Sequence, residues 1–109
     1  MNTINLDDFS KLDLRVGKIL EAEKIENSEK LVKLQVSLGD EERQIIAGIG
    51  KSYLPEELVG RLVVVLANLE PKKLMGYESQ GMILAASDET GLPSLLTVDK
   101  QISPGSKIK

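Results

Sequence analysis

The sequence contains no histidine and no cysteine. Without them the chain cannot form a Ser-His-Asp triad, a thiolate nucleophile or an ordinary zinc site. It cannot form a disulfide either, so the composition gives no sign of secretion. Because histidine is the commonest acid–base residue of enzymes, catalysis would depend on carboxylates, lysine, tyrosine and the backbone. We therefore expect a non-catalytic protein that uses no cofactor and no metal.

Long apolar runs are also missing, and aromatic residues are scarce. No stretch approaches the roughly 20 apolar residues of a membrane span, and residues 1–8 are polar and acidic, unlike a signal peptide. These features favour a cytoplasmic protein with no membrane partner. With one Phe, two Tyr and no Trp, the core must consist of Val, Leu and Ile, which suits a small barrel. The 109 residues predict a single domain over residues 1–109.

The apolar residues that are present form segments of strand length, separated by turn residues. Residues 32–38 alternate strictly between apolar and polar side chains, which predicts a strand with one buried and one wet face. Extended segments are also expected at 14–25, with a bulge or coil near Gly17, and at 43–47. Pro55 followed by two acidic residues indicates a short helix at 55–58.

Residues 62–67 and 81–86 are apolar on both predicted faces, so each strand is expected to be covered twice, and a partner subunit could supply the second cover. Residues 68–80 are interpreted as a long loop, and residues 95–98 as a short extra strand. Three strands, a short helix and two strands are the order of an OB-fold, an all-β, five-stranded Greek-key barrel. Another small all-β barrel or sandwich is the alternative.

The formal net charge is −3, which argues against nucleic acid unless the basic residues are clustered. An OB-fold binds its ligand on strands two and three and on two flanking loops. Most acidic residues are expected elsewhere, although Glu29, Glu70 and Glu78 dilute this face. Each basic or polar residue here could be an ordinary surface residue, but together they suit phosphate binding. The candidates are Lys30, Lys33, Asn68, Lys72, Lys73, Ser79, Gln80 and Met82.

Tyr77 is the only aromatic residue predicted on this face. Generic binding of single strands depends on aromatic stacking, so a basic face with little stacking would read backbone shape instead. The expected nucleic acid is therefore a folded RNA, not DNA.

Several segments are characteristic when they occur together, above all the combination of NLEPKK with ESQGM. From about Phe9 to the C-terminus, the sequence resembles the tRNA-binding domain family, whose members include the C-terminal domain or β subunit of methionyl-tRNA synthetase and a free-standing structure-specific tRNA-binding protein. The segments are 12–19 (LDLRVGKI), 28–31 (SEKL), 36–43 (VSLGDEER), 47–49 (AGI), 55–60 (PEELVG), 67–73 (ANLEPKK) and 78–86 (ESQGMILAA).

The resemblance implies an OB-fold homodimer that grips the outer corner of tRNA by shape, without a cofactor. It implies that Lys33, the loop 68–73 and the segment 79–82 form the tRNA surface, and that apolar outer faces and the C-terminal region form the dimer. It also implies a methionyl-tRNA synthetase catalytic body as partner, in cis or in trans. Two departures predict modest affinity: the family often has a basic residue where this chain has Glu70, and another where it has Leu74 or Met75.

Two alternatives remain open. The chain could be a dimerisation or assembly module with little RNA binding of its own. It could also be a chaperone-like peptide-binding OB domain, because a related branch shares the barrel.

Overall fold

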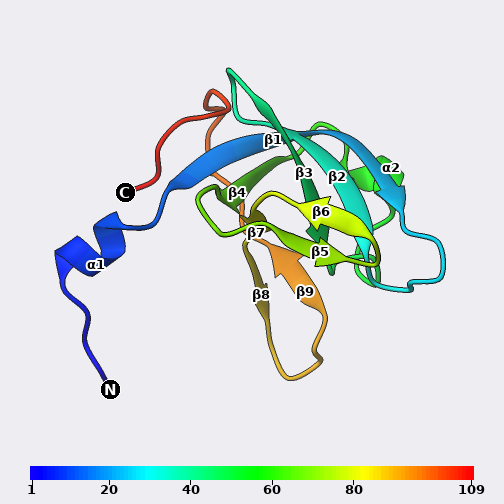
Figure 1. Cartoon of the computed structure of the whole chain (residues 1–109), viewed down its shortest axis with the longest axis horizontal. Helices are drawn as coiled ribbons and strands as arrows, with labels where there is room; N and C mark the ends of the chain where they lie inside the picture. Colours follow the sequence, from blue (N-terminus) through cyan, green and yellow to red (C-terminus); the bar gives the residue numbers. More distant parts are fainter.

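A computed structural model describes the whole chain, residues 1–109. Its main unit is a five-stranded antiparallel sheet in the order β3-β2-β1-β4-β7 (Figure 1). These strands are β1 (Leu14–Lys24), β2 (Val32–Ser37), β3 (Glu42–Ala47), β4 (Leu62–Leu66) and β7 (Met82–Ile83). The sheet curls until β3 contacts β7, and the Gln80 amide donates to the Gln44 carbonyl at 2.8 Å. This nearly closed barrel confirms the predicted OB-like fold.

Strand β1 is long because it serves two neighbours in turn. Its first half pairs with β4 and its second half pairs with β2, with a register shift between Ile19 and Glu21. A Cβ at Gly17 would lie 2.7 Å from a methyl group of Val36 and 2.9 Å from one of Val65. Glycine is therefore required where β1 crosses the core, and the bulge predicted near Gly17 lies just after it.

The core is aliphatic, as the composition predicts. Strand β2 alternates between buried and half-buried residues along its whole length, which confirms the period-two interpretation. The short helix α2 (Pro55–Leu58) buries Leu58 completely against the barrel. Strand β4 is buried on both faces within the single chain, since even Val64 is only 7% exposed. A partner subunit is thus not needed to cover β4.

The bounds of the last two predicted strands are wrong. Residues 81–86 do not form one strand: β7 ends at Ile83, and β8 (Ala85–Ser87) pairs instead with β9 (Pro93–Leu95). The small side chains of β8 contribute little to a core, and this hairpin projects from the barrel (Figure 1). The extra strand expected at 95–98 is β9, which begins and ends earlier.

The predicted loop 68–80 contains a second β-hairpin, formed by β5 (Lys72–Leu74) and β6 (Tyr77–Ser79). Met75 and Gly76 make its turn, with φ values of 52° and 84°. Positive φ at both central residues is the geometry of a type I′ turn, whose twist suits a tight hairpin. Methionine is not the usual residue at the first position, so the sequence concealed the turn.

The C-terminal segment lies beside the start of β1, whereas the N-terminal arm leads into β1 from outside the barrel (Figure 1). Helix α1 (Leu6–Ser10), which the sequence analysis did not predict, projects from the barrel and buries none of its residues (Figure 1). The C-terminal segment returns along β1, where Gly105 donates to the Val16 carbonyl at 2.7 Å and Ile108 donates to the Leu14 carbonyl at 2.8 Å. Neither helix is long and apolar enough to cross a membrane.

Candidate nucleic-acid interface

The hairpin β5–β6 is fastened to β3 by side chains. The buried Ser79 hydroxyl, in a residue only 5% exposed, accepts a hydrogen bond from the Ile46 amide at 2.9 Å and donates one to the Gly81 carbonyl at 3.0 Å. The Gln44 side chain donates to the Glu78 carbonyl at 2.9 Å. Ser79, a candidate for tRNA contact, therefore uses its hydroxyl inside the protein and positions the hairpin.

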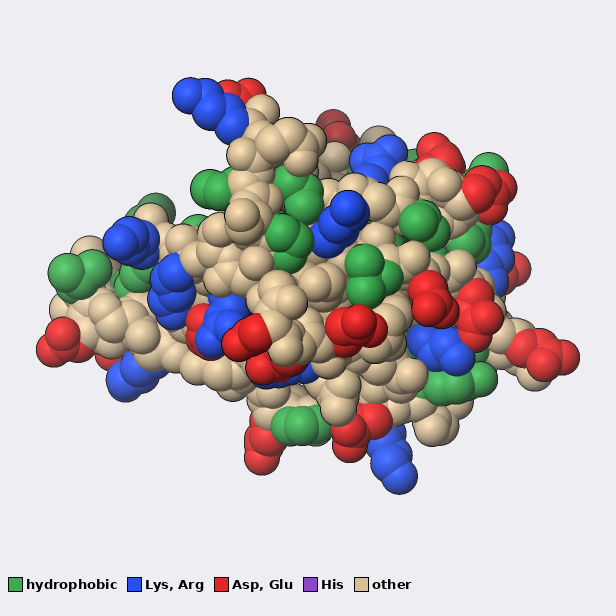
Figure 2. Space-filling view, turned by 90° about the horizontal axis from the view of Figure 1, so that it is seen from above, with side chains coloured by type: hydrophobic (Ala, Val, Ile, Leu, Met, Phe, Trp, Pro, Cys, Tyr) green, Lys and Arg blue, Asp and Glu red, His purple; other side chains and the backbone are tan.

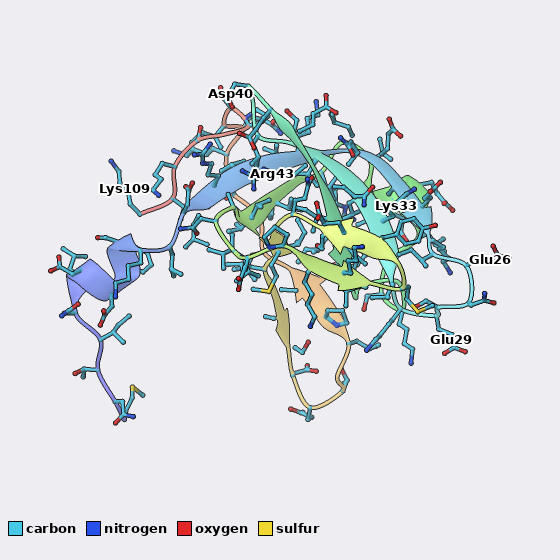
Figure 3. All side chains as sticks on the ribbon, viewed as in Figure 1. Glu26, Glu29, Lys33, Asp40, Arg43 and Lys109 are labelled. Carbon is cyan, nitrogen blue, oxygen red and sulfur yellow. The ribbon has the colours of Figure 1, made fainter.

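Arg43, at the start of β3, holds both ends of this segment. Its guanidinium donates to the Ala67 carbonyl at 2.6 Å, before the hairpin, and to the Gln80 carbonyl at 3.1 Å, after it. Figure 3 shows Arg43 near the middle of the molecule. The sequence analysis missed this role. The one available signal was a basic residue at the start of an otherwise amphipathic strand.

Lys33 lies on β2 with its ammonium nitrogen 5.0 Å from the centre of the Tyr77 ring, which belongs to β6 (Figure 3). The same nitrogen lies 2.7 Å from a carboxylate oxygen of Glu23. That hydrogen bond, more than any other influence, raises the pKa of the Lys33 ammonium. The structure thus brings Lys33 against the hairpin that carries the next two candidate lysines.

Lys72 and Lys73 are exposed on β5, opposite Ser79 and Glu78 in the ladder, and neither has an ion-pair partner. Lys30 is exposed in the connection between β1 and β2, where its carbonyl accepts a hydrogen bond from the Gly50 amide at 2.7 Å. No hydrogen bond or ion pair links the Lys30 side chain to the other candidates. The two hairpin lysines are therefore available to an anion.

A shallow cavity of about 350 Å³ lies across β1, β2 and β3, beside Lys33. Its walls carry two acidic residues that the sequence analysis did not place on this face, and the lining consists of Glu21, Ala22, Glu23, Lys33, Leu34, Gln35 and Gln44. Acidic and basic side chains are likewise interspersed on the surface seen in Figure 2. The cavity is mixed in charge. Of the four candidate lysines, Lys33 is the one held in an ion pair.

The remaining candidates take part in internal contacts to different extents. The Asn68 side chain accepts from the Asp13 amide at 2.9 Å and donates to the Lys11 carbonyl at 2.7 Å, which ties the N-terminal segment to the end of β4. The Gln80 side chain accepts from the Gln44 amide at 3.1 Å. Met82 is 43% exposed and lines a separate, mainly apolar cleft with the end of β3 and with β8.

The model of a protein family described as "Putative tRNA binding domain" matches residues 14–107, which include the barrel, both hairpins and the returning C-terminal segment. This chain belongs to that family. All eight candidate residues lie within the matched region. Six lie between the start of β1 and the end of β6, Gln80 directly follows β6, and Met82 begins β7.

Relatives in the family are synthetases and smaller proteins. The chain is 62% identical to methionine–tRNA ligase of Thermotoga maritima over 107 residues, which are 98% of this chain and 17% of the ligase. It is similar over its whole length to a MetRS-related protein from Pyrococcus horikoshii (40% identity, 100% of both chains, TM-score 0.94). It is also similar to the chaperone CsaA from Bacillus anthracis (32% identity, 99% of this chain and 100% of that chain, TM-score 0.91).

The chain thus spans about one sixth of the ligases that it matches (17% and 16% for two of them). This coverage confirms that it corresponds to an appended domain and not to a whole synthetase.

Its residues offer hydrogen-bond donors and cations to a ligand, and no group of three or more acidic, His or Cys residues is arranged to hold a metal ion.

The base of the N-terminal segment contains an ion-pair cluster of Asp13, Arg15 and Lys107. Arg15 donates two hydrogen bonds of 3.0 Å to the Asp13 carboxylate, and Lys107 donates one of 3.1 Å. The hydrogen bonds from Arg15, and then those from Lys107, lower the pKa of Asp13. Arg15 is only two residues from Asp13, whereas Lys107 is 94 residues away and could not be expected there.

Proposed function

We propose that this chain is a non-catalytic module that binds tRNA by shape. The observation that carries the proposal is the contact of Lys33 on β2 with Tyr77 of the hairpin that also bears Lys72 and Lys73, in a member of a family described as tRNA-binding. Phosphate binding needs several cations on one surface, and this contact brings two separate basic segments together. Asn68, Ser79 and Gln80 support that surface, Met82 flanks it, and Lys30 extends it along the β1–β2 connection.

Recognition of shape follows from the residues available. Tyr77 alone offers a stacking surface in this region, so bases cannot be held one after another as in single-strand binders. The ligand is therefore a folded RNA whose phosphates are fixed in space. With few unpaired cations on this surface and a net charge of −3, affinity is modest and falls as salt is raised.

Modest affinity is sufficient if the module works beside a methionyl-tRNA synthetase catalytic body in the cytoplasm, in cis or in trans. The similarity to methionine–tRNA ligases supports this arrangement. Tethering or docking raises the effective concentration of bound tRNA near the catalytic body. The module then enhances tRNA capture without selecting the amino acid.

The test is a triple variant, Lys33→Ala with Lys72→Ala and Lys73→Ala, titrated with a fluorescently labelled tRNA transcript at about 50 mM salt. We expect binding to weaken several-fold. The slope of log Kd against log salt should fall by about 1.5, because each unpaired lysine that meets a phosphate contributes about 0.7 to 0.9. The matched control removes three lysines near the termini, Lys11, Lys100 and Lys109. If both triple variants bind alike, the assignment of the surface is wrong.

We also propose that the chain works as a homodimer. Helix α1 has five residues and buries none of them, and so short a helix is not stable without packing. Ile4 and Leu6 on this arm are 70% and 76% exposed, and Leu92 and Leu96 beside the β8–β9 hairpin are exposed as well. A second copy would cover these apolar groups. Light scattering at micromolar concentration should give twice the mass of the chain, and a monomer would contradict the proposal.

One observation favours a second function, the binding of unfolded peptide. The apolar cleft of about 330 Å³ beside Met82 is lined by seven hydrophobic residues, and one similar structure is described as a chaperone. A competition experiment separates the functions. Unfolded polypeptide that binds and is not displaced by tRNA would support the peptide site, whereas a tight dimer that binds neither would indicate an assembly module.

A further inference from the structure

Lys33 is the meeting point of three segments that are distant in sequence. It pairs in register with Glu23 of the neighbouring strand β1, and its ammonium group lies 2.7 Å from the Glu23 carboxylate. On its other side the ammonium faces the Tyr77 ring at 5.0 Å, within the range of a cation–π contact. Figure 3 shows Lys33 at the right of the molecule, on the opposite side from Lys109. The Lys33 ammonium group therefore already interacts with a carboxylate and an aromatic ring of the same chain.

The ion pair is also easy to open. The Glu23 side chain is 65% exposed, so water can solvate its carboxylate if Lys33 leaves, and exposed pairs of this kind are weak. A phosphate that approaches Lys33 meets the negative charge of Glu23 at almost the same place. It must either displace the carboxylate or bind next to it and be repelled.

We propose that Glu23 sets the affinity of this surface for tRNA, by holding Lys33 in an ion pair that an incoming phosphate has to break. The inference rests on the proposed function, and it identifies Glu23 as a residue that weakens tRNA binding. Lys72 and Lys73 have no such partner, so they make the first phosphate contacts. Lys33 is held back by Glu23 and joins the contact only when a phosphate replaces the carboxylate.

The ion pair between Lys33 and Glu23 also changes how tRNA binding depends on salt. A lysine that neutralises a phosphate normally contributes by releasing a bound counterion from the RNA. Here the negative charge displaced from Lys33 stays in place, on Glu23, so the gain from counterion release is offset by the repulsion between Glu23 and the phosphate. Lys33 should therefore add little to the salt slope of the natural chain, although it lies at the centre of the surface.

The experiment uses Glu23→Gln, which keeps the shape and a hydrogen-bond acceptor for Lys33 but removes the charge. We expect tRNA binding at about 50 mM salt to tighten by about three- to tenfold, the Coulomb effect of one charge at the separation of neighbouring groups. The slope of log Kd against log salt should become steeper by about 0.7 to 0.9. An unchanged or weaker affinity would overturn the inference.

The matched control is Glu21→Gln. Glu21 lies two residues earlier on the same strand and lines the same cavity, but it pairs in register with Gln35 and not with Lys33. If it tightens binding as much as Glu23→Gln, the effect comes from net charge alone and the specific role of Glu23 is wrong. In a Lys33→Met background, which keeps the aliphatic stem, the effect of Glu23→Gln should disappear. If it persists, Glu23 does not act through Lys33.

Two readouts separate this inference from the proposed function. The Lys33 ammonium can be followed by NMR in the free protein, where Glu23→Gln should lower its pKa whether or not tRNA binds. In the tRNA titration, the double variant Lys72→Ala, Lys73→Ala should bind more weakly. If it does and Glu23→Gln has no effect, only the role of Glu23 is overturned. A natural chain that does not bind tRNA at low salt overturns both.

Discussion

The β5–β6 and β8–β9 hairpins have strands of equal length and differ in how they are attached. Each consists of two three-residue strands added to the barrel. The first is fastened to β3 by the Ser79 hydroxyl, the Gln44 side chain and the Arg43 guanidinium. The second has one side-chain bond from its strands, in which the Leu95 amide donates to the Tyr53 hydroxyl at 3.0 Å, and one just after β9, in which the Thr97 hydroxyl donates to the Leu62 carbonyl at 2.7 Å.

This difference in attachment corresponds to a difference in what each hairpin presents. The fastened hairpin bears Lys72 and Lys73 and meets Lys33 through Tyr77, and a fixed spacing of charges is useful for reading the shape of an RNA. The less fastened hairpin presents small and apolar residues, with all of β8 exposed. A surface of that kind suits a partner that supplies the missing packing. The two ladders have equal strand lengths, so the difference in attachment comes from side chains and not from the ladders.

Among the substitutions that test the difference in attachment between the two hairpins, Arg43→Met should have the largest effect. It removes the hydrogen bonds to the Ala67 and Gln80 carbonyls, and bonds to a charged group contribute about 1.5 to 3 kcal/mol. We expect a loss of about 2 kcal/mol in the free energy of unfolding, measured with urea, and faster amide exchange in β5–β6 than in β8–β9. The control is Arg61→Met, an exposed arginine with one backbone bond and a cation–π contact with Tyr53, which should cost about 0.5 kcal/mol and leave exchange in β5–β6 unchanged.

A smaller effect is expected for Ser79→Ala. The Ile46 amide loses its acceptor in a buried place, and an unsatisfied buried donor costs about 1 to 3 kcal/mol. We expect a loss near the lower end, about 1 kcal/mol, because only one bond to β3 is removed. Urea unfolding measures the loss. Ser94→Ala, in the exposed part of β9, is the matched control, and equal losses in the two variants would contradict the contrast between the hairpins.

The smallest effect is expected for Tyr53→Phe, which removes the bond to the Leu95 amide. The site is only partly buried, so water can replace the hydroxyl, and the loss in unfolding free energy should be about 0.5 kcal/mol. Hydrogen exchange should nevertheless become faster in β8–β9 while β5–β6 is unchanged. Slow exchange in β8–β9 of the variant would show that this hairpin is held by something other than Tyr53.

The sequence predicts the barrel better than its additions. The alternation of residues 32–38 and the positions of Pro55 and Gly17 led to correct strands and a correct helix, because each pattern is local and burial enforces it. The hairpin turn at Met75 and Gly76 was missed because methionine rarely takes a positive φ. The apolar run 81–86 was read as one strand because a run of this kind does not show where the chain leaves the sheet.

The candidate interface shows the same division. Lys33, Lys72 and Lys73 could be chosen from the sequence, because an OB-fold places strand two and the loop before its last strand on one side. The partners of these lysines could not. Glu23 faces Lys33 only because of the register between β1 and β2, and Arg43 reaches two carbonyls that are 24 and 37 residues away.

By itself the sequence determined the aliphatic barrel and the absence of thiol and imidazole chemistry, since both depend on composition and short-range periodicity. The tertiary structure alone decided which charges are free and which are paired. That outcome depends on distances between side chains from different strands, which pairing register and sheet closure set and which no local pattern encodes.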